Sequence, residues 1–425
     1  MMRKRILIIG AGAAGSSAAQ ALHQSGTDLE VTVIGAENLA PYNRTTVNKG
    51  LLSGAVDLEN IILPGMDLPG YAWQLGTNVT ALDPSTRTVE LENGATIEAD
   101  AVLLATGAEP RALTAAVDDG ARSRVLRLRS AADTQRLRAL TIANLPGHVV
   151  IAGAGLIGTE TAAVLLEAGC QVTLTDPSPL PMRNHLGHTI AQWVATAHRT
   201  AGVDFRPATT ITEIRAADEA LLVSLAVGNS LHAAVVLASL GVTPATGWLE
   251  GSGIPLQAGR RPGAILVDQD QRVEGLSGMY AAGDAAAVPG LDGKPARIEH
   301  WGAAISQGRS AAAAILRDLH GEPSEVGSTQ PLIPPATASY STYVHGTKLT
   351  ILGSPANGVR EQFILGNLDS PRFALAFFDA EDRITGAVGV GGARAVNQLR
   401  SAIARRAHAA ELETEASFEP VGGPQ

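Results

Sequence analysis

A glycine pattern that occurs twice constrains this chain more than any other feature of its sequence. In each copy a short, mainly apolar run leads into Gly-x-Gly-x-x-Gly, and a helix-forming segment follows. The two glycine sets are Gly10, Gly12 and Gly15, and Gly153, Gly155 and Gly158. Predicted strands at 5–9 and 148–152 precede the two glycine turns. Predicted helices follow them, one at 16–24 and one from the end of the second glycine turn to about residue 168. Apolar runs of this kind are typical of buried parallel strands, so the pattern predicts a doubly wound α/β fold.

The spacing of these glycines has a specific chemical use. The first allows the tight turn, the second lets backbone amides approach a pyrophosphate, and the third lets the helix pack closely on the strand. Each copy also places an acid about 20 residues further on, Glu37 after a strand at 30–34 and Asp176 after a strand at 171–175, where a carboxylate can accept from ribose hydroxyls. The alternative for the glycine pattern is a purely structural turn in a parallel sheet. The alternative for Glu37 is an ordinary loop carboxylate.

Two dinucleotide sites in one chain predict a flavin and a nicotinamide. Asp176 would repel a 2′-phosphate, and the residues after it offer no Lys or Arg until Arg183. The sequence therefore favours NADH over NADPH.

Composition excludes several other classes. The chain has 425 residues, of which 45% are hydrophobic and 17% charged, as expected for two or three globular domains. Its net charge of −9 and its lack of a basic block argue against a nucleic-acid ligand. A single cysteine, Cys170, excludes an internal disulfide, a two-cysteine redox centre and a cysteine-ligated cluster, and indicates a reducing, cytoplasmic compartment. We expect no metal site. We also expect no membrane-spanning segment, since no run reaches roughly 18 apolar residues. The sequence leaves the oligomeric state open.

Several further motifs carry a family resemblance that covers nearly the whole chain. They are Leu104 to Arg111 (LATGAEPR), Tyr280 to Ala285 (YAAGDA), Pro41 to Arg44 with Lys49, Ile298 to Trp301, and Gln307 to Arg309. With the glycine turns, these motifs resemble the FAD-dependent pyridine nucleotide reductases. Within that family the sequence is most similar to the NADH-dependent ferredoxin and rubredoxin reductases that serve bacterial oxygenases, and to proteins like apoptosis-inducing factor.

The resemblance implies two Rossmann-like dinucleotide-binding domains and a C-terminal α+β interface domain. We expect the FAD-binding domain at 1–112 and 247–327, the NAD-binding domain at 113–246, and the interface domain at 328–425. In the last, alternating patterns predict strands at 348–352, 361–366, 372–379 and 384–390, and a helix at 395–409.

The resemblance also implies where the two cofactors meet. Lys49 is expected beside the flavin N5 edge, and Glu160 is expected to meet the nicotinamide and pair with that lysine. A cation there would stabilise the anionic reduced flavin. The resemblance also implies that Asp284 contacts the ribityl and phosphate region of the flavin. Independently of the family, an acid that follows a strand at 278–282 would point into the ligand crevice at the carboxyl edge of the sheet. The alternative for Lys49 is a solvated lysine, and for Glu160 an acid in the first turn of a helix. The alternative for Asp284 is an N-cap of the next helix.

Four other residues complete the predicted cofactor contacts. Arg44 is expected to reach the pyrophosphate, and Trp301 to line the pyrimidine end of the flavin. Thr106 and Gly107 form the hinge where the chain leaves the first nucleotide domain. A surface arginine, a core tryptophan and a plain turn are the respective alternatives.

The sequence departs from the family in two places. The usual double proline after the Tyr-x-Arg run is Thr45-Thr46, which we expect to loosen a loop beside the flavin. The aromatic stretch of the interface domain is present at 338–343 but lacks Trp. A local basic patch in the last domain could still attract an acidic iron–sulfur protein. Its members are Arg394, Arg400, Arg405 and Arg406.

The sequence thus predicts an NADH-dependent flavoprotein reductase that passes electrons to a small ferredoxin serving a haem monooxygenase or a Rieske dioxygenase. One alternative is a flavin oxidoreductase acting directly on a quinone, oxygen or a metabolite. Another is a signalling protein of the apoptosis-inducing-factor type that binds flavin and NADH.

Overall fold

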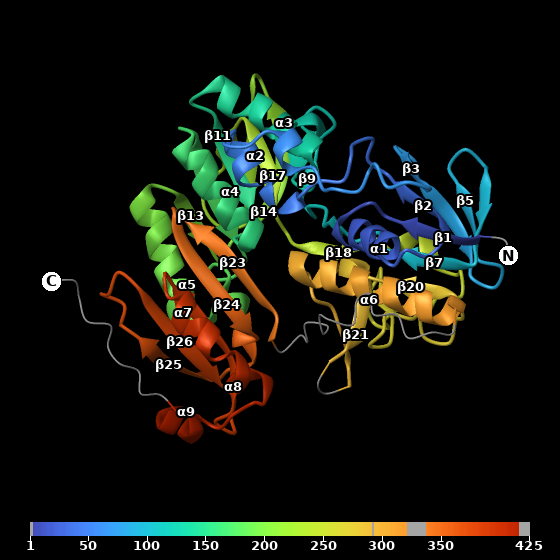
Figure 1. The fold of residues 1–425 in the computed structure, drawn as a ribbon. Helices are drawn as coiled ribbons and strands as arrows, with labels where there is room; N and C mark the ends of the chain where they lie inside the picture. Colours follow the sequence, from blue (N-terminus) through green and yellow to red (C-terminus); the bar gives the residue numbers. More distant parts are fainter. Residues whose placement is uncertain (1–2, 291–292, 321–336, 416–425) are drawn as a thin grey trace. The chain divides into compact units, whose positions relative to one another are not determined.

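The computed structural model describes residues 3–290, 293–320 and 337–415. The chain divides into two compact units (Figure 1). The first unit comprises Met1–Thr114, Ser123–Asn144 and Leu237–Pro335, and the second comprises Ala115–Arg122, Leu145–Val236 and Ala336–Gln425. The predicted boundary between residues 327 and 328 lies outside the described residues.

A five-stranded parallel sheet forms the centre of the first unit. Its order is β20-β7-β1-β2-β3. The strands are β1 (Lys4–Ile9), β2 (Leu29–Gly35), β3 (Tyr71–Leu75), β7 (Ala101–Leu104) and β20 (Met279–Ala281). The apolar run predicted as the first strand is β1, and Ile6 and Ile8 are buried in the core of this unit. The predicted strand therefore folds as its lack of alternation indicated.

Helices α1 (Ala13–Gln24) and α6 (Trp301–His320) pack against this sheet and against each other (Figure 1). Both present small buried side chains, including Ala18 and Ala312. A Cβ added at Gly308 would lie 2.2 Å from the carbonyl oxygen of Ala14. Glycine at this position therefore lets the two helix backbones approach closely.

The remaining elements of the first unit are short. They are α2 (Gly50–Ser53), α3 (Ala131–Leu140), β10 (Val125–Arg127), the antiparallel sheet β4 (Val79–Asp83), β5 (Thr88–Leu91) and β6 (Thr96–Glu98), the pair β8 (Ala108–Pro110) and β18 (Val242–Pro244), and the sheet β19 (Ile265–Leu266), β21 (Ala286–Pro289) and β22 (Pro295–Ala296). Single turns of 3₁₀ helix include Arg44–Thr46 and Gly283–Ala285.

The second unit repeats the strand–turn–helix arrangement. Its first sheet contains, in order, β17 (Val235–Ala238), β11 (His148–Ala152), β12 (Gln171–Asp176) and β13 (Asp204–Pro207), and α4 (Leu156–Glu167) follows β11. The pairs β11–β12 and β12–β13 are parallel. A second sheet has the order β16 (Leu231–Ala233), β15 (Ala220–Leu225), β14 (Ile211–Ala217) and β9 (Ala116–Val117).

An antiparallel sheet of order β23-β24-β27-β26-β25 forms the C-terminal part of the second unit. The strands are β23 (Ser339–Val344), β24 (Thr347–Gly353), β25 (Arg360–Leu365), β26 (Phe373–Phe378) and β27 (Ile384–Val390). Four of these match the predicted strands, and β23 was not predicted. The helix α5 (Arg183–Ala201), which kinks at Gly187, packs one apolar face against this sheet through Ile190 and Val194.

The prediction of one helix at 395–409 is wrong. The segment forms two short helices, α7 (Ala393–Gln398) and α8 (Arg400–Ala404), and α9 (Ala409–Glu415) follows separately. Arg406 has a φ of 50°, which ends the helical path, and the amide of Ile384 donates to the carbonyl of Ala407 at 2.9 Å. Pairing with the start of β27 therefore overrides the local helical preference.

Candidate functional site

The first glycine of each turn has the same backbone geometry. Gly10 has a φ of 112° and Gly153 a φ of 104°. The amide of Gly10 donates to the carbonyl of Ile34, and that of Gly153 to the carbonyl of Thr175, both at 2.8 Å. Only glycine adopts such a φ without strain. The two turns are therefore structural copies, and each is hydrogen-bonded to the strand that follows its helix.

The middle and last glycines of the turns differ in their surroundings. Gly12 and Gly155 cap α1 and α4 with φ angles of −73° and −77°, and a Cβ added at either would meet no atom within 4 Å. A Cβ at Gly15 would lie 1.9 Å from the carbonyl oxygen of Gly10. Packing thus requires glycine at position 15 but not at 12 or 155. The open space over these two helix N-termini fits a pyrophosphate on each.

Glu37 is held by two neighbouring side chains in the first unit. Its carboxylate accepts from the Tyr42 hydroxyl at 2.6 Å and from Arg44 Nη2 at 2.5 Å. Burial is the main cause that raises the pKa of Tyr42 to about 12, and the hydrogen bond to Glu37 contributes in the same direction. Glu37 is therefore not a solvated loop acid. Arg44 also donates to the carbonyl of Arg129, so it is anchored at two points.

Asp284 lies in the 3₁₀ turn directly after β20, and the N-cap of that turn is Ala282, so Asp284 does not act as an N-cap. Its Oδ2 lies 3.6 Å from Nη2 of Arg129, which sequence reasoning missed because 155 positions of chain separate them and no spacing pattern links them. Burial lowers the pKa of the Arg129 guanidinium. The preceding Gly283 amide donates to Gln307 Oε1 at 2.7 Å, which fixes the turn against α6.

The hinge residues lie beside the same arginine. Gly107 has a φ of 73°, and a Cβ added there would lie 3.5 Å from Nη2 of Arg129. The hydroxyl of Thr106 is buried and has no hydrogen-bond partner among the described residues. A buried hydroxyl without a partner is costly, so it fits a ligand atom at this position. The structure thus gathers Thr106, Gly107, Arg129 and Asp284 in the first unit.

Lys49 and Trp301 also belong to the first unit. Lys49 Nζ donates to the carbonyl of Thr45 at 3.2 Å and to Asn48 Oδ1 at 3.3 Å. Trp301 is the first residue of α6 and is partly buried.

The loop that lacks the double proline is held by hydrogen bonds instead. Asn43 Oδ1 accepts from the amide of Thr45 at 3.1 Å and from its hydroxyl at 2.7 Å, and the Thr46 hydroxyl donates to the carbonyl of Asn43 at 2.7 Å. The Asn-Arg-Thr-Thr sequence therefore forms an ordered 3₁₀ turn.

Asp176 lies at the end of β12 and is oriented by its own glycine turn. Its Oδ2 accepts from the amide of Ala154 at 2.6 Å, and its Oδ1 accepts from the amide of Ser178 at 2.7 Å. The carboxylate is thus fixed next to the turn that Gly153 begins, which is where a ribose would lie.

Glu160 is a buried acid, with 4% of its surface exposed, in the first two turns of α4. Its Oε1 accepts from the hydroxyl of Thr342 on β23 at 2.7 Å. Sequence reasoning missed Thr342, which lies within the stretch that lacks the expected tryptophan. Lys49 and Glu160 belong to different units, so their ion pair stays a prediction.

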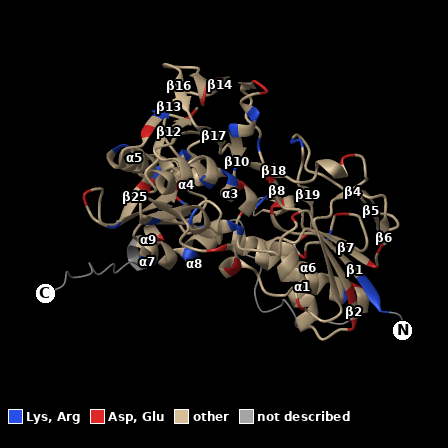
Figure 2. Cartoon of the chain, turned by 90° about the horizontal axis from the view of Figure 1, so that it is seen from above, with Lys and Arg blue, Asp and Glu red and all other residues tan. Residues whose placement is uncertain are grey.

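Two of the four arginines in the predicted basic patch pair with carboxylates. Arg405 pairs with Glu411, and Arg406 pairs with Asp379. Charges of both signs are interspersed along the chain (Figure 2). Among the residues in the described ranges, no group of three or more His, Cys, Asp or Glu side chains is placed to hold a metal ion. No helix in the described part of the chain is long and apolar enough to cross a bilayer.

Comparison with known proteins identifies the family. Residues 4–308 match the model of the pyridine nucleotide-disulphide oxidoreductases, so the chain belongs to this family. The predicted α/β fold, the assignment as an oxidoreductase enzyme, and the use of FAD and NAD(H) are confirmed at this level.

Individual relatives cover most of the chain. It is 31% identical to the biphenyl dioxygenase system ferredoxin–NAD(+) reductase component of Paraburkholderia xenovorans, over 86% of this chain and 84% of the relative. It is 30% identical to the corresponding component of the p-cumate 2,3-dioxygenase system of Pseudomonas putida, over 95% and 92%. A solved ferredoxin reductase for the CYP199A2 system of Rhodopseudomonas palustris superimposes with a TM-score of 0.79 at 25% identity, over 92% and 91%.

Proposed function

We propose that this protein is the NADH-dependent FAD reductase of an oxygenase system and that it passes electrons to a small iron–sulfur ferredoxin. The observation that carries the proposal is the pair of glycine turns with open middle positions in a chain that has one cysteine. A family member that forms a dithiol needs two cysteines, so electrons from this flavin site must leave to an external acceptor. The relatives named as dioxygenase reductase components support a ferredoxin as that acceptor.

The residues divide between the two nucleotides. We assign FAD to Gly10, Gly12, Gly15, Glu37, Arg44, Thr106, Gly107, Asp284 and Trp301, and NADH to Gly153, Gly155, Gly158, Glu160 and Asp176. The corresponding domains are 1–112 with 247–327 for FAD and 113–246 for NADH, followed by the interface domain at 328–425. We place the protein in the cytoplasm, because its single cysteine is typical of a reducing compartment.

The chemistry that bound FAD supplies is acceptance of a hydride from NADH and release of single electrons. The chain contributes binding, orientation and charge. The amides beside Gly12 and Gly155 bind the pyrophosphates, and Asp176, fixed by Ala154 and Ser178, accepts from the ribose and rejects a 2′-phosphate. Lys49 supplies positive charge at the flavin, and Glu160 orients the nicotinamide.

The test is NADH turnover with a panel of acceptors. We expect fast reduction of ferricyanide and of at least one small ferredoxin from an oxygenase system, and slow reduction of oxygen. Fast turnover of a quinone or oxygen with no ferredoxin activity would favour the direct oxidoreductase. A stable NADH complex that reduces no acceptor would favour the signalling protein.

A further inference from the structure

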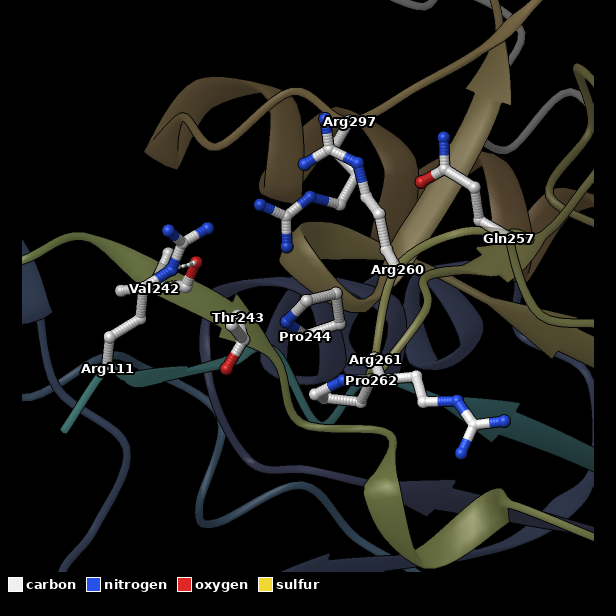
Figure 3. A pocket seen from close by; sticks show the side chains of 9 residues that line it. All are labelled: Arg111, Val242, Thr243, Pro244, Gln257, Arg260, Arg261, Pro262 and Arg297. Carbon is white, nitrogen blue, oxygen red and sulfur yellow. Dashed lines mark hydrogen bonds between the residues drawn. The ribbon is translucent and has the colours of Figure 1, made fainter. Parts of the chain in front are cut away.

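The first unit contains a cavity of about 320 Å³ that involves none of the residues assigned to the cofactors (Figure 3). It is lined by Arg111, Val242, Thr243, Pro244, Gln257, Arg260, Arg261, Pro262 and Arg297. Its volume is within the range of small-molecule sites. We call it the arginine cavity.

In the described part of the chain one carboxylate, that of Glu299, counters the positive charge of the arginine cavity, by an ion pair with Arg297 and at longer range through Arg111. Among the described residues, Arg111, Arg260 and Arg261 form no ion pair with a carboxylate. Arg297 pairs with Glu299 through Nη2, but its Nη1 is buried and has no hydrogen-bond partner in the described ranges. A buried guanidinium nitrogen without an acceptor is costly. The cavity therefore favours an anion.

The guanidinium groups converge. Figure 3 shows the side chains of Arg111, Arg260 and Arg297 directed into one space, whereas the side chain of Arg261 extends away from them. Three like charges in one small cavity repel one another, and a bound anion would remove that repulsion.

Three separate segments that bear these arginines are fixed by hydrogen bonds. The amide of Arg111 donates to the carbonyl of Gly241 at 3.0 Å. The amide of Gln257 donates to the carbonyl of Ala264 at 2.7 Å and closes the loop that carries Arg260. The side chain of Gln257 donates to the carbonyl of Pro295 at 3.3 Å, two residues before Arg297. The cavity is therefore preorganised, which lowers the entropic cost of binding.

We propose that the arginine cavity binds a small phosphorylated anion, with Arg111, Arg260 and Arg297 as its cationic contacts. Guanidinium groups donate paired hydrogen bonds to phosphate oxygens, and a phosphate group offers more charge and more acceptors than a carboxylate. The concave shape and limited volume favour a small molecule over the acidic surface of a protein. This site is independent of the proposed electron transfer.

The residue that follows β8, Arg111, and the residues of β18 line the cavity, close in sequence to points where the chain leaves and re-enters the first unit. An anion that joins Arg111 to Arg260 and Arg297 would tie these segments to the body of the first unit. We therefore expect the ligand to stabilise the folded first unit against heat.

The test uses the full-length, FAD-loaded protein and inorganic pyrophosphate as the probe. Isothermal titration and thermal unfolding are measured at constant ionic strength with sodium chloride, and with saturating NAD⁺ so that the probe does not enter the nicotinamide site. We expect one pyrophosphate per chain and a rise in Tm that chloride does not reproduce. Arg260→Ala and Arg111→Ala should each lower the affinity about tenfold or more.

Arg261→Ala is the matched control, because it removes the same charge from the neighbouring position whose side chain extends away. We expect it to change the affinity less than about threefold. Retained flavin absorbance and circular dichroism check folding, and Arg260→Lys replaces Arg260→Ala if the latter fails to fold. Equal effects of the substitutions at 260 and 261, or stabilisation by chloride alone, would overturn the proposal. Absence of pyrophosphate binding, with a raised KM for a ferredoxin in Arg260→Ala, would assign the surface to a protein partner instead.

Discussion

The hydroxyl of Thr342 donates a hydrogen bond of 2.7 Å to Oε1 of Glu160, although 182 positions separate the two residues in the chain. Both side chains are buried in the second unit, with 1% and 4% of their surfaces exposed. Glu160 comes from α4, directly after the second glycine turn, and Thr342 from β23. The C-terminal sheet thus fixes the orientation of the acid proposed to meet the nicotinamide.

Thr342→Val should disturb that orientation. Valine keeps the shape of threonine but removes the hydroxyl, so a buried carboxylate oxygen loses this hydrogen bond, at a cost of about 1–3 kcal/mol. We expect slower flavin reduction in stopped-flow with NADH and little change in bound FAD. Thr342→Ser retains the donor and should restore the rate. Equal rates in the valine variant and the unaltered protein would show that the bond does not position Glu160 for hydride transfer.

Lys49→Ala and Glu160→Gln test the proposed pair at the flavin. Loss of the cation makes reduced flavin less favourable, so flavin reduction by NADH should slow by about tenfold or more, equivalent to roughly 1.4 kcal/mol. FAD should stay bound through the glycine turn. Lys348→Ala and Glu167→Gln change exposed residues of the same types and serve as controls. Unchanged reduction rates in both test variants would limit the pair to a structural role.

The nicotinamide preference depends on Asp176. A 2′-phosphate facing this carboxylate should cost on the order of 1–3 kcal/mol, so kcat/KM should favour NADH. Asp176→Ser combined with Pro177→Arg removes the repulsion and adds a phosphate-binding cation, and should narrow or invert the preference. Equal use of NADPH by the unaltered protein would show that Asp176 does not face the ribose.

The middle glycines separate folding from cofactor binding. Gly12→Ala adds a methyl group where the protein has open space, so the unfolding free energy of the FAD-free protein should change by less than about 0.5 kcal/mol while FAD binding is lost. Gly155→Ala should instead weaken NADH binding and leave FAD bound. Gly15→Ala, whose Cβ would overlap the carbonyl of Gly10, should destabilise the FAD-free protein itself. Tight FAD binding by Gly12→Ala would show that the open space is not the pyrophosphate site.

A buried histidine should make the second unit sensitive to acid. His198 is fully buried, its Nδ1 lies 3.0 Å from Nε2 of His345, and burial, followed by the charge of His345, lowers the pKa of His198 to about 3. At pH values below the ordinary histidine pKa of about 6.5, His198 binds a proton in the unfolded chain but stays neutral in the folded chain. Stability should therefore fall as the pH is lowered from about 6.5 toward 3, by up to about 1.4 kcal/mol per pH unit for this group.

Urea unfolding at pH 7 and pH 5 measures this effect. His198→Leu should lose less stability between the two pH values than the unaltered protein. His188→Gln, at an exposed histidine of the same helix, should behave like the unaltered protein. Identical pH dependence of His198→Leu and the unaltered protein would show that His198 does not supply the linkage.

The sequence by itself determined the two strand–turn–helix units, because their signals are local. Each unit shows an apolar run, then a glycine with a positive φ (Gly10 or Gly153), then a helical segment. Each of these features depends only on residues that are neighbours in sequence. The same holds for the strands β24 to β27, each of which contains aromatic or β-branched residues that favour an extended conformation. The acids Glu37 and Asp176 followed from a fixed offset to these turns.

Tertiary structure alone decided which side chains meet. Arg129 reaches Asp284, Thr342 reaches Glu160, and Arg111, Arg260 and Arg297 share one cavity, although each set comes from distant positions. The segment at 395–409 has helical composition, but its hydrogen bonds to the start of β27 interrupt it. Local conformational preference is set by neighbours in sequence, whereas the partner of a buried polar group is set by how the elements pack. No local pattern in the sequence shows which distant residue that partner is.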